Sequence, residues 1–178
     1  KREMTVISLV GYTNAGKSTL LNTLTGAGLY TEDKLFATLD PSVRRGTIAG
    51  GKPVLFSDTV GFIRRLPSEL WTAFQATLEE LSDSDLLLHV VDLSHPDYLN
   101  QLYTVREHLA RLDSKYYQRE VLVFNKLDAV TGRFNRDLLQ QKFPGACFIS
   151  ALTGEGIENL KQVLLDEISK SYLKLRLY

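Results

Sequence analysis

Residues 5–18 read TVISLVGYTNAGKS, a short apolar run followed at once by a loop with glycine at 11 and 16 that ends in Lys17 and Ser18. The run has the length and the β-branched content of a buried strand, and a helix is expected from residue 17 to about residue 25. A strand, a G-x-x-x-x-G-K-[ST] loop and a helix in this order are typical of the P-loop. This segment therefore predicts a phosphate-binding loop at the end of a sheet strand.

The P-loop pattern gives its positions distinct roles. Backbone N–H groups face the α and β phosphates, the Lys17 ammonium reaches the β and γ phosphates, and the Ser18 hydroxyl ligates Mg²⁺. The predicted nucleotide contacts in this segment are Gly11, Tyr12, Thr13, Asn14, Ala15, Gly16, Lys17, Ser18 and Thr19. The alternative is a glycine-rich turn before a helix, and composition alone produces the motif in roughly 1 in 150 chains of this length.

Apolar runs alternate with helical stretches along the whole chain, which indicates an α/β fold with helices on both faces of a sheet. The expected strands are 5–10, 43–49, 53–58, 86–92, 121–125 and 146–150, and the expected helices are 17–25, 68–81, 96–112 and 156–171. Gly50 and Gly51 indicate a hairpin turn, so one strand pair should be antiparallel. Residues 133–137 are expected to be a surface connection. The sequence predicts one domain over 1–178, a P-loop NTPase G domain with a mostly parallel six-stranded sheet.

Residues 125–128, NKLD, follow an expected strand and bear on the choice of base. The Asp128 carboxylate can accept two hydrogen bonds from the N1–H and the exocyclic amine of guanine, whereas adenine offers no such pair. Asn125 can tie the loop or meet the base edge, and the stem of Lys126 can cover the base face. The alternative for Asp128 is a helix N-cap, and N-K-x-D arises by chance in roughly 1 in 50 such chains. Together with the P-loop, this motif favours guanine nucleotides.

Two shorter segments complete the predicted site. Ser150, Ala151 and Leu152 follow the last expected strand, where the Ala151 N–H can donate to the guanine oxygen. Asp58 ends another expected strand and is predicted to act on Mg²⁺ through water, while the N–H of Gly61 faces the γ phosphate. A lone D-x-x-G is also common as a turn, so the order and spacing of the segments carry the prediction.

The stretch between the first helix and the hairpin, residues 29–41, shows no clear periodicity and contains Thr31 and Thr38. We predict Thr38 as a ligand of Mg²⁺ and of the γ phosphate in a mobile switch, which makes Ser18, Thr38 and Asp58 the predicted metal ligands. A solvent-exposed loop threonine is the alternative.

Four segments, GYTNAGKSTLLN (11–22), LFATLDP (35–41), DTVGFIRRLP (58–67) and NKLD (125–128), resemble the HflX GTPases. The resemblance spans nearly the whole chain, and DTVGFIRRLP with LFATLDP is far more specific than the nucleotide motifs. It implies a translational GTPase-like fold, binding to the large ribosomal subunit and a role in ribosome splitting or rescue. It also implies an N-terminal domain that makes much of the ribosome contact. Because the chain begins at Lys1, it is expected to be part of a longer protein.

Hydrolysis is expected to be slow without help. The residue after D-x-x-G is Phe62, which cannot hydrogen-bond, where many small GTPases have a Gln that orients the attacking water. The resemblance points to Asn14 instead, since related GTPases with Asn at this place use it to hold K⁺ beside the phosphates. The predicted catalytic residues are Lys17, Thr38, Gly61 and Asn14. The expected cofactors are Mg²⁺ and K⁺, with GTP as substrate and GDP as product.

Charge and composition limit the partners of the domain. Lys plus Arg (21) balances Asp plus Glu (21), so no long-range field attracts the whole domain to RNA or to an anionic membrane. The local cluster of Arg44, Arg45, Arg64 and Arg65 can contact ribosomal RNA or supply an arginine finger, with solvated surface arginines as the alternative. No apolar stretch approaches the ~20 residues of a membrane span. With its single Cys147 in a buried strand, the domain is expected to be soluble, cytoplasmic and monomeric.

Three functional hypotheses follow. The first is a GTPase whose turnover the ribosome accelerates, and the second is a GTP-dependent scaffold in which hydrolysis is incidental, as Phe62 would allow. The third is a related GTPase that acts in tRNA modification, in ribosome assembly or at membranes.

Overall fold

The computed structural model describes residues 4–26, 42–59, 61 and 68–176. Its strands are β1 Val6–Gly11, β2 Ser42–Thr47, β3 Pro53–Asp58, β4 Leu86–Asp92, β5 Glu120–Asn125 and β6 Cys147–Phe148. Its α-helices are α1 Lys17–Thr25, α2 Trp71–Ser82, α3 Tyr98–Leu112, α4 Arg136–Lys142 and α5 Ile157–Arg176. Short 3₁₀ turns lie at η1 Ala49–Gly51, η2 Ser68–Leu70, η3 Tyr116–Gln118 and η4 Leu127–Ala129.

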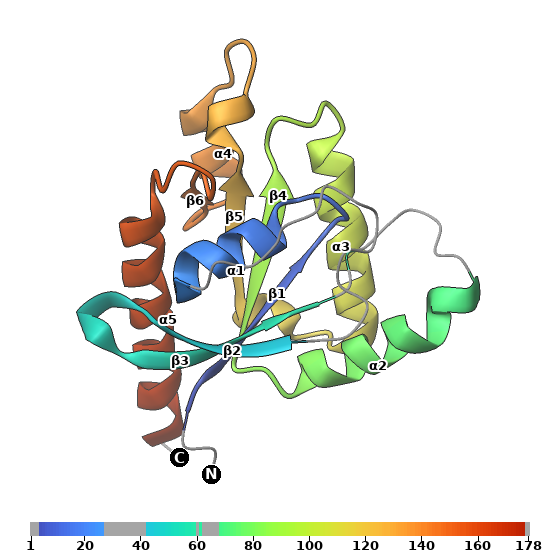
Figure 1. Ribbon diagram of the computed structural model, residues 1–178, viewed down its shortest axis with the longest axis vertical. Coiled ribbons are helices and arrows are strands. Elements are labelled where there is room, and N and C mark those ends of the chain that lie inside the picture. Colours follow the sequence, from blue (N-terminus) through green and yellow to red (C-terminus); the bar gives the residue numbers. More distant parts are fainter. Residues whose placement is uncertain (1–3, 27–41, 60, 62–67, 177–178) are drawn as a thin grey trace.

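The strands form one six-stranded sheet in the order β2-β3-β1-β4-β5-β6 (Figure 1). β2 runs antiparallel to β3, and every other neighbouring pair is parallel. Gly50 and Gly51, both at a φ of 70°, form the turn between β2 and β3, a conformation that residues with a Cβ rarely adopt. The predicted mostly parallel sheet with one antiparallel pair is confirmed.

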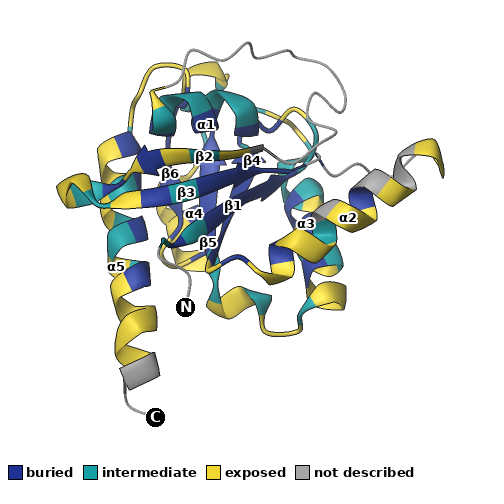
Figure 2. Cartoon of the chain, turned by 60° about the horizontal axis from the view of Figure 1, so that its bottom comes forward, coloured by how far each residue is buried: buried dark blue, intermediate teal, exposed yellow. Residues whose placement is uncertain are grey.

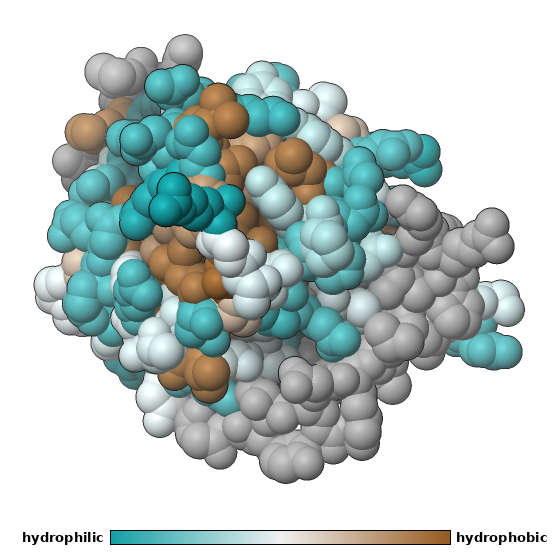
Figure 3. All heavy atoms as spheres, turned by 90° about the horizontal axis from the view of Figure 1, so that it is seen from above, coloured by the Kyte–Doolittle hydropathy of each residue, from teal (hydrophilic) through white to brown (hydrophobic). Residues whose placement is uncertain are grey.

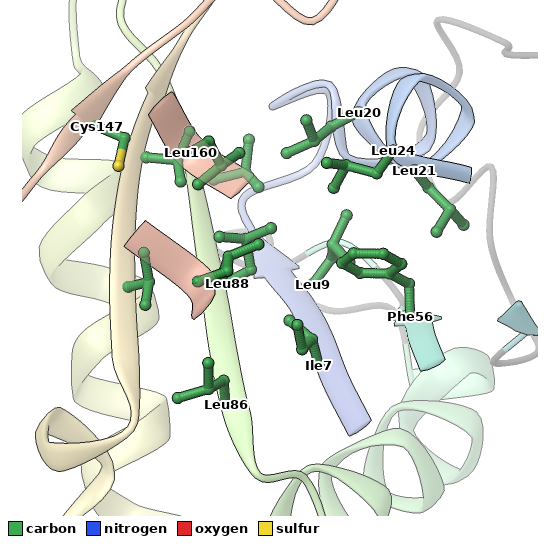
Figure 4. Close-up of a cluster of buried hydrophobic side chains, with 14 of the residues drawn as sticks. Ile7, Leu9, Leu20, Leu21, Leu24, Phe56, Leu86, Leu88, Cys147 and Leu160 are labelled. Carbon is green, nitrogen blue, oxygen red and sulfur yellow. The ribbon is translucent and has the colours of Figure 1, made fainter. Parts of the chain in front are cut away.

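Helices cover both faces of the sheet, as predicted. On one face, α1 and α5 pack over the largest cluster of buried apolar side chains, in which Leu20, Leu21 and Leu24 meet Ile7, Leu9, Phe56, Leu88 and Leu160 (Figure 4). On the other face, α2 and α3 share a second cluster, and α3 and α4 pack over a third. The central strands are consequently buried while the outer surfaces of the helices stay exposed (Figure 2). Burial of this kind is the main stabilising contribution in such a fold.

Cys147 lies in β6 within the core, as expected from its apolar neighbours. Burial raises the pKa of its thiol to about 11, so the thiol stays protonated at neutral pH. The side chain therefore acts as a small apolar core residue.

The structure corrects one predicted connection. Residues 133–137 do not form a simple surface connection, because α4 begins at Arg136. The side chain of Asn135 accepts a hydrogen bond from the Leu138 N–H at 2.9 Å and caps the helix, and Leu139 is buried against the sheet. A helix of 7 residues is too short to show clear apolar periodicity, which explains why the sequence pattern missed it.

Several predicted boundaries also shift. β2 ends at Thr47 because the following residues form η1, and β6 is limited to Cys147 and Phe148 instead of the expected 146–150. α5 continues to Arg176, five residues beyond its predicted end at 171. Ile157, Leu160, Leu164 and Ile168 form its buried stripe. Among the helices that the structure describes, none combines the length and apolar character needed to cross a membrane.

Candidate nucleotide-binding site

The predicted site segments meet at one edge of the sheet. β1, β3, β4, β5 and β6 are parallel, so the loops that follow them leave the sheet on the same side. Figure 3 looks onto this end of the molecule, where hydrophilic side chains surround a smaller hydrophobic area. Open α/β sheets bind ligands outside the carboxyl ends of their strands, which makes this edge the candidate site.

The loop between β1 and α1 is tightly curled. Asn14 and Gly16 have positive φ angles of 62° and 95°, and the Ala15 N–H donates to the Tyr12 carbonyl at 3.1 Å. A Cβ at Gly16 would lie 2.4 Å from Asn125 Nδ2. Gly16 also occupies the N-cap position of α1, where it has no side chain to accept hydrogen bonds from the first N–H groups of the helix. These N–H groups can therefore donate to a phosphate.

Lys17 and Ser18 follow the loop and face Asp58 at the end of β3. The Ser18 hydroxyl donates to Asp58 Oδ2 at 3.1 Å, and the Thr59 N–H donates to Asp58 Oδ1 at 2.9 Å. Burial lowers the pKa of the Lys17 ammonium, and the nearby Asp58 carboxylate opposes this shift. The Lys17 ammonium could pair with an anion, and the oxygens of Ser18 and Asp58 could bind a hard cation beside it.

Ser18 and Asp58 fit the chemistry of Mg²⁺. Both present oxygen ligands, and Mg²⁺ is commonly held by one or two protein oxygens together with water and substrate phosphates. Since the Ser18 hydroxyl donates its hydrogen bond to Asp58 Oδ2, the lone pairs of its oxygen stay available to a cation.

Gly61 lies against the phosphate loop. A Cβ at this residue would lie 2.8 Å from Thr13 Cα and 3.2 Å from Lys17 Nζ, so only glycine fits without a shift of its neighbours. The Thr59 hydroxyl donates to the Leu9 carbonyl at 2.6 Å and ties this segment to β1. The structure thus brings together the predicted residues Gly61 and Lys17.

Asn125 joins the phosphate loop to the loop after β6. Its side-chain Nδ2 donates to the Ala15 carbonyl at 3.0 Å, and its Oδ1 accepts from the Ala151 N–H at 3.0 Å. Of the two roles considered for Asn125, the structure therefore shows the loop tie. The Ala151 N–H, expected to face the guanine oxygen, is engaged by Asn125, so a bond to the base would have to be shared with it.

Asp128 lies in η4 with an exposed side chain. The Ser150 hydroxyl donates to Asp128 Oδ1 at 2.5 Å and orients the carboxylate. Leu152, two residues after Ser150, is 76% exposed. The residue that precedes η4 is Lys126, so Asp128 does not act as a helix N-cap. The carboxylate is held in place and remains accessible to a base.

Lys126 connects the loop after β5 to the phosphate loop and to the end of β4. Its backbone has a positive φ of 67°. Its ammonium donates to the Asn14 carbonyl at 2.7 Å and pairs with Asp92 Oδ2 at 3.0 Å. Asp92, and Ser94 beside it, are site residues that sequence reasoning missed. The signal for Asp92 was its position as the polar end of a buried strand.

Of the remaining predicted residues, only some lie in the part of the chain that the structure describes. Arg44 is half-buried and Arg45 is exposed on β2. Arg45 lines a cavity of ≈ 480 Å³ together with Lys161 and the end of α1. Thr38, Phe62, Arg64 and Arg65 lie outside the described residues.

This fold, with a glycine-bounded loop between β1 and α1 and the NKLD loop after β5, defines a P-loop G domain of the GTPase class. The chain belongs to the family of 50S ribosome-binding GTPases, whose sequence model matches residues 6–126.

The resemblance to the HflX GTPases is confirmed by relatives. A GTPase HflX of Magnetococcus marinus is 47% identical over 170 residues, and one of Escherichia coli is 42% identical over 172 residues. These alignments cover 94% and 95% of this chain but only 38% and 40% of the two relatives. The chain thus spans about two fifths of the length of the relatives it matches.

Solved structures share the fold. Era of Aquifex aeolicus bound to GDP·AlF₄⁻ superposes with a TM-score of 0.75 at 23% identity, covering 93% of this chain and 57% of Era. A GTP-binding protein of Sulfolobus solfataricus in complex with GDP gives a TM-score of 0.67 at 26% identity, covering 93% of this chain and 53% of that protein.

Proposed function

We propose that the chain binds Mg²⁺·GTP and hydrolyses it to GDP and phosphate as the switch domain of a ribosome-associated HflX-type GTPase. The target is the large ribosomal subunit, in ribosome splitting or rescue. The observation that carries the nucleotide part is Asn125, which ties the phosphate loop to the loop after β6 through two hydrogen bonds of 3.0 Å. The ribosomal part is supported by the family and by the HflX relatives.

Phosphate recognition depends on the P-loop. The curled backbone of residues 11–18 and the N-terminus of α1 supply N–H donors and a positive potential. The Lys17 ammonium is poorly hydrated because it is buried, and this burial lowers its pKa. A phosphate placed beside Lys17 would favour the charged amine, so binding of the anion and protonation of Lys17 support each other.

Ser18 and Asp58 are the residues that would hold the metal ion, Asp58 through water, with Thr38 as a further ligand. When bound, Mg²⁺ neutralises the charge that develops on the phosphates during transfer. The protein's own groups position the substrate: the Lys17 ammonium lies close to Gly61, whose backbone N–H is proposed to meet the γ phosphate.

Base recognition depends on the residues after β5 and β6. The exposed Asp128 carboxylate, oriented by Ser150, would accept from guanine N1–H and the exocyclic amine. Lys126 and Asn125 fix the backbone around it. Adenine lacks the paired donors, so the site should reject ATP.

We also propose that intrinsic hydrolysis is slow, because Phe62 cannot orient water. We propose that Asn14 compensates by helping to bind K⁺. Its side chain is exposed at the P-loop while its carbonyl is held by Lys126, so its amide oxygen can take part in a K⁺ site beside the phosphates. The charge of K⁺ there would act as an arginine finger does in other GTPases.

The test is single-turnover GTP hydrolysis by the protein alone, with large ribosomal subunits and with tRNA, each in KCl and in NaCl at equal ionic strength. We expect the rate in KCl to exceed that in NaCl by about tenfold or more, and the subunits to raise it further. Asn14→Gly keeps the positive φ at no steric cost and should remove the K⁺ advantage.

The K⁺ site, the hydrolytic activity and the ribosomal target are tested separately. Equal rates in KCl and NaCl would remove the K⁺ site. Hydrolysis rates that do not change in any condition would favour the GTP-dependent scaffold. Stimulation by tRNA, with none by ribosomal subunits, would favour a GTPase that acts in tRNA modification.

A further inference from the structure

Asp92 stands at the carboxyl end of β4, opposite Asn125 in the register of β4 and β5. Both of its carboxylate oxygens are used, and by different partners. Oδ1 accepts from the Ser94 N–H at 2.9 Å and from the Ser94 hydroxyl at 2.5 Å, whereas Oδ2 pairs with Lys126 Nζ at 3.0 Å. Ser94 therefore orients the carboxylate through Oδ1, so that Oδ2 is directed at Lys126.

The Lys126 ammonium passes this restraint on to the phosphate loop, because it also donates to the Asn14 carbonyl at 2.7 Å. Asn14 and Lys126 are the non-glycine residues with positive φ in the part of the chain that the structure describes, at 62° and 67°. Such conformations persist only where the surroundings hold them. A single hydrogen bond thus joins two unusual backbone positions, one on each side of the nucleotide site.

We propose that Asp92 is a positioning residue for nucleotide binding. It holds the Lys126 ammonium against the Asn14 carbonyl and so couples the base loop to the phosphate loop; this inference rests on the proposed function. Asp92 itself need not touch the nucleotide. Without its carboxylate, Lys126 is free to turn toward water, since the lysine side chain is 30% exposed, and the Asn14 carbonyl loses its charged donor.

A purely structural role for Asp92, as the start of the turn with Ser94, makes a different prediction. Asp92→Asn is nearly isosteric and keeps an oxygen that can accept from Ser94. It replaces only the other oxygen with an amide NH₂, which cannot accept a hydrogen bond from Lys126. The substitution therefore separates the two interactions of this side chain.

The experiment measures the affinity of the protein for Mg²⁺·GTP and for GDP by titration calorimetry, and KM and kcat for GTP hydrolysis. Asp92→Asn should raise both dissociation constants by about tenfold, with the larger kinetic change in KM. Lys126→Met should weaken binding at least as much. The double variant should bind no more weakly than Lys126→Met alone, because both substitutions remove the same interaction.

The control is Asp113→Asn, which removes the carboxylate of the Arg119 pair at 2.8 Å, outside the site. It should leave both dissociation constants unchanged. Ser94→Ala offers a second route if Asp92→Asn does not fold: it should weaken binding about two- to threefold, and not at all in the Lys126→Met background.

Binding by Asp92→Asn within twofold of the unmodified protein would overturn the proposal, as would effects of Asp92→Asn and Lys126→Met that multiply. A lower melting temperature without a change in affinity would leave Asp92 a structural residue only and would also overturn it. Failure of the unmodified protein to bind GTP or GDP would instead refute the proposed function.

Discussion

Asp128→Asn is expected to weaken GTP binding by roughly two orders of magnitude and to make xanthosine triphosphate the preferred nucleotide. The carboxylate accepts from two donors on guanine, and an amide presents one donor in place of one acceptor. Xanthine carries a carbonyl where guanine carries its amine, so the amide matches it. Ser150 can still donate to the remaining oxygen of the Asn side chain, so the local structure should be kept. Competition between labelled GTP and each unlabelled nucleotide measures the switch.

The control for this substitution is Asp137→Asn in the first turn of α4, where the carboxylate is exposed and belongs to none of the site loops. It should bind GTP as the unmodified protein does. If Asp128→Asn also keeps its GTP affinity, the assignment of Asp128 to the base is wrong.

Gly16→Ala is expected to lower nucleotide affinity by roughly a hundredfold or more and to destabilise the fold by about 1–3 kcal/mol. Two effects combine at this residue. A Cβ would lie 2.4 Å from Asn125 Nδ2, so Asn125 would have to release the Ala15 carbonyl, and a φ of 95° is strained for alanine. Calorimetric titration and thermal denaturation report the two effects separately.

Gly132→Ala is a close match for the backbone strain. Gly132 has a φ of 94°, and a Cβ there would meet no atom within 4 Å. The control should lose stability through strain alone and keep its nucleotide affinity. Equal affinities for the two variants would show that the hydrogen bond from Asn125 to the Ala15 carbonyl is not needed for binding.

The sequence predicts the P-loop and the strands that lead to the site well because these features are local. Residues 5–25 carry their strand, loop and helix in one continuous stretch, and the structure reproduces that order. α4 shows the limit of local patterns. Its 7 residues contain too few turns for periodicity, and the cap at Asn135 is a short polar signal that also fits a loop.

The connections within the site could not be predicted from spacing. The Asn125 amide has both a donor and an acceptor, and the motif does not say whether they meet the base or the protein. Its partner Ala15 lies 110 positions away in the chain. The role inferred for Asp92 likewise depends on the distance from its Oδ2 to Lys126 Nζ, which appears only when β4 and β5 are paired.

The selectivity of the site for guanine nucleotides is measured by a calorimetric titration of the purified protein with GTP and with ATP, each in excess Mg²⁺. We expect saturable GTP binding and ATP binding that is weaker by about 100-fold or more, because only guanine presents paired donors to Asp128. Equal affinity for the two nucleotides, or no binding of GTP, would contradict this expectation.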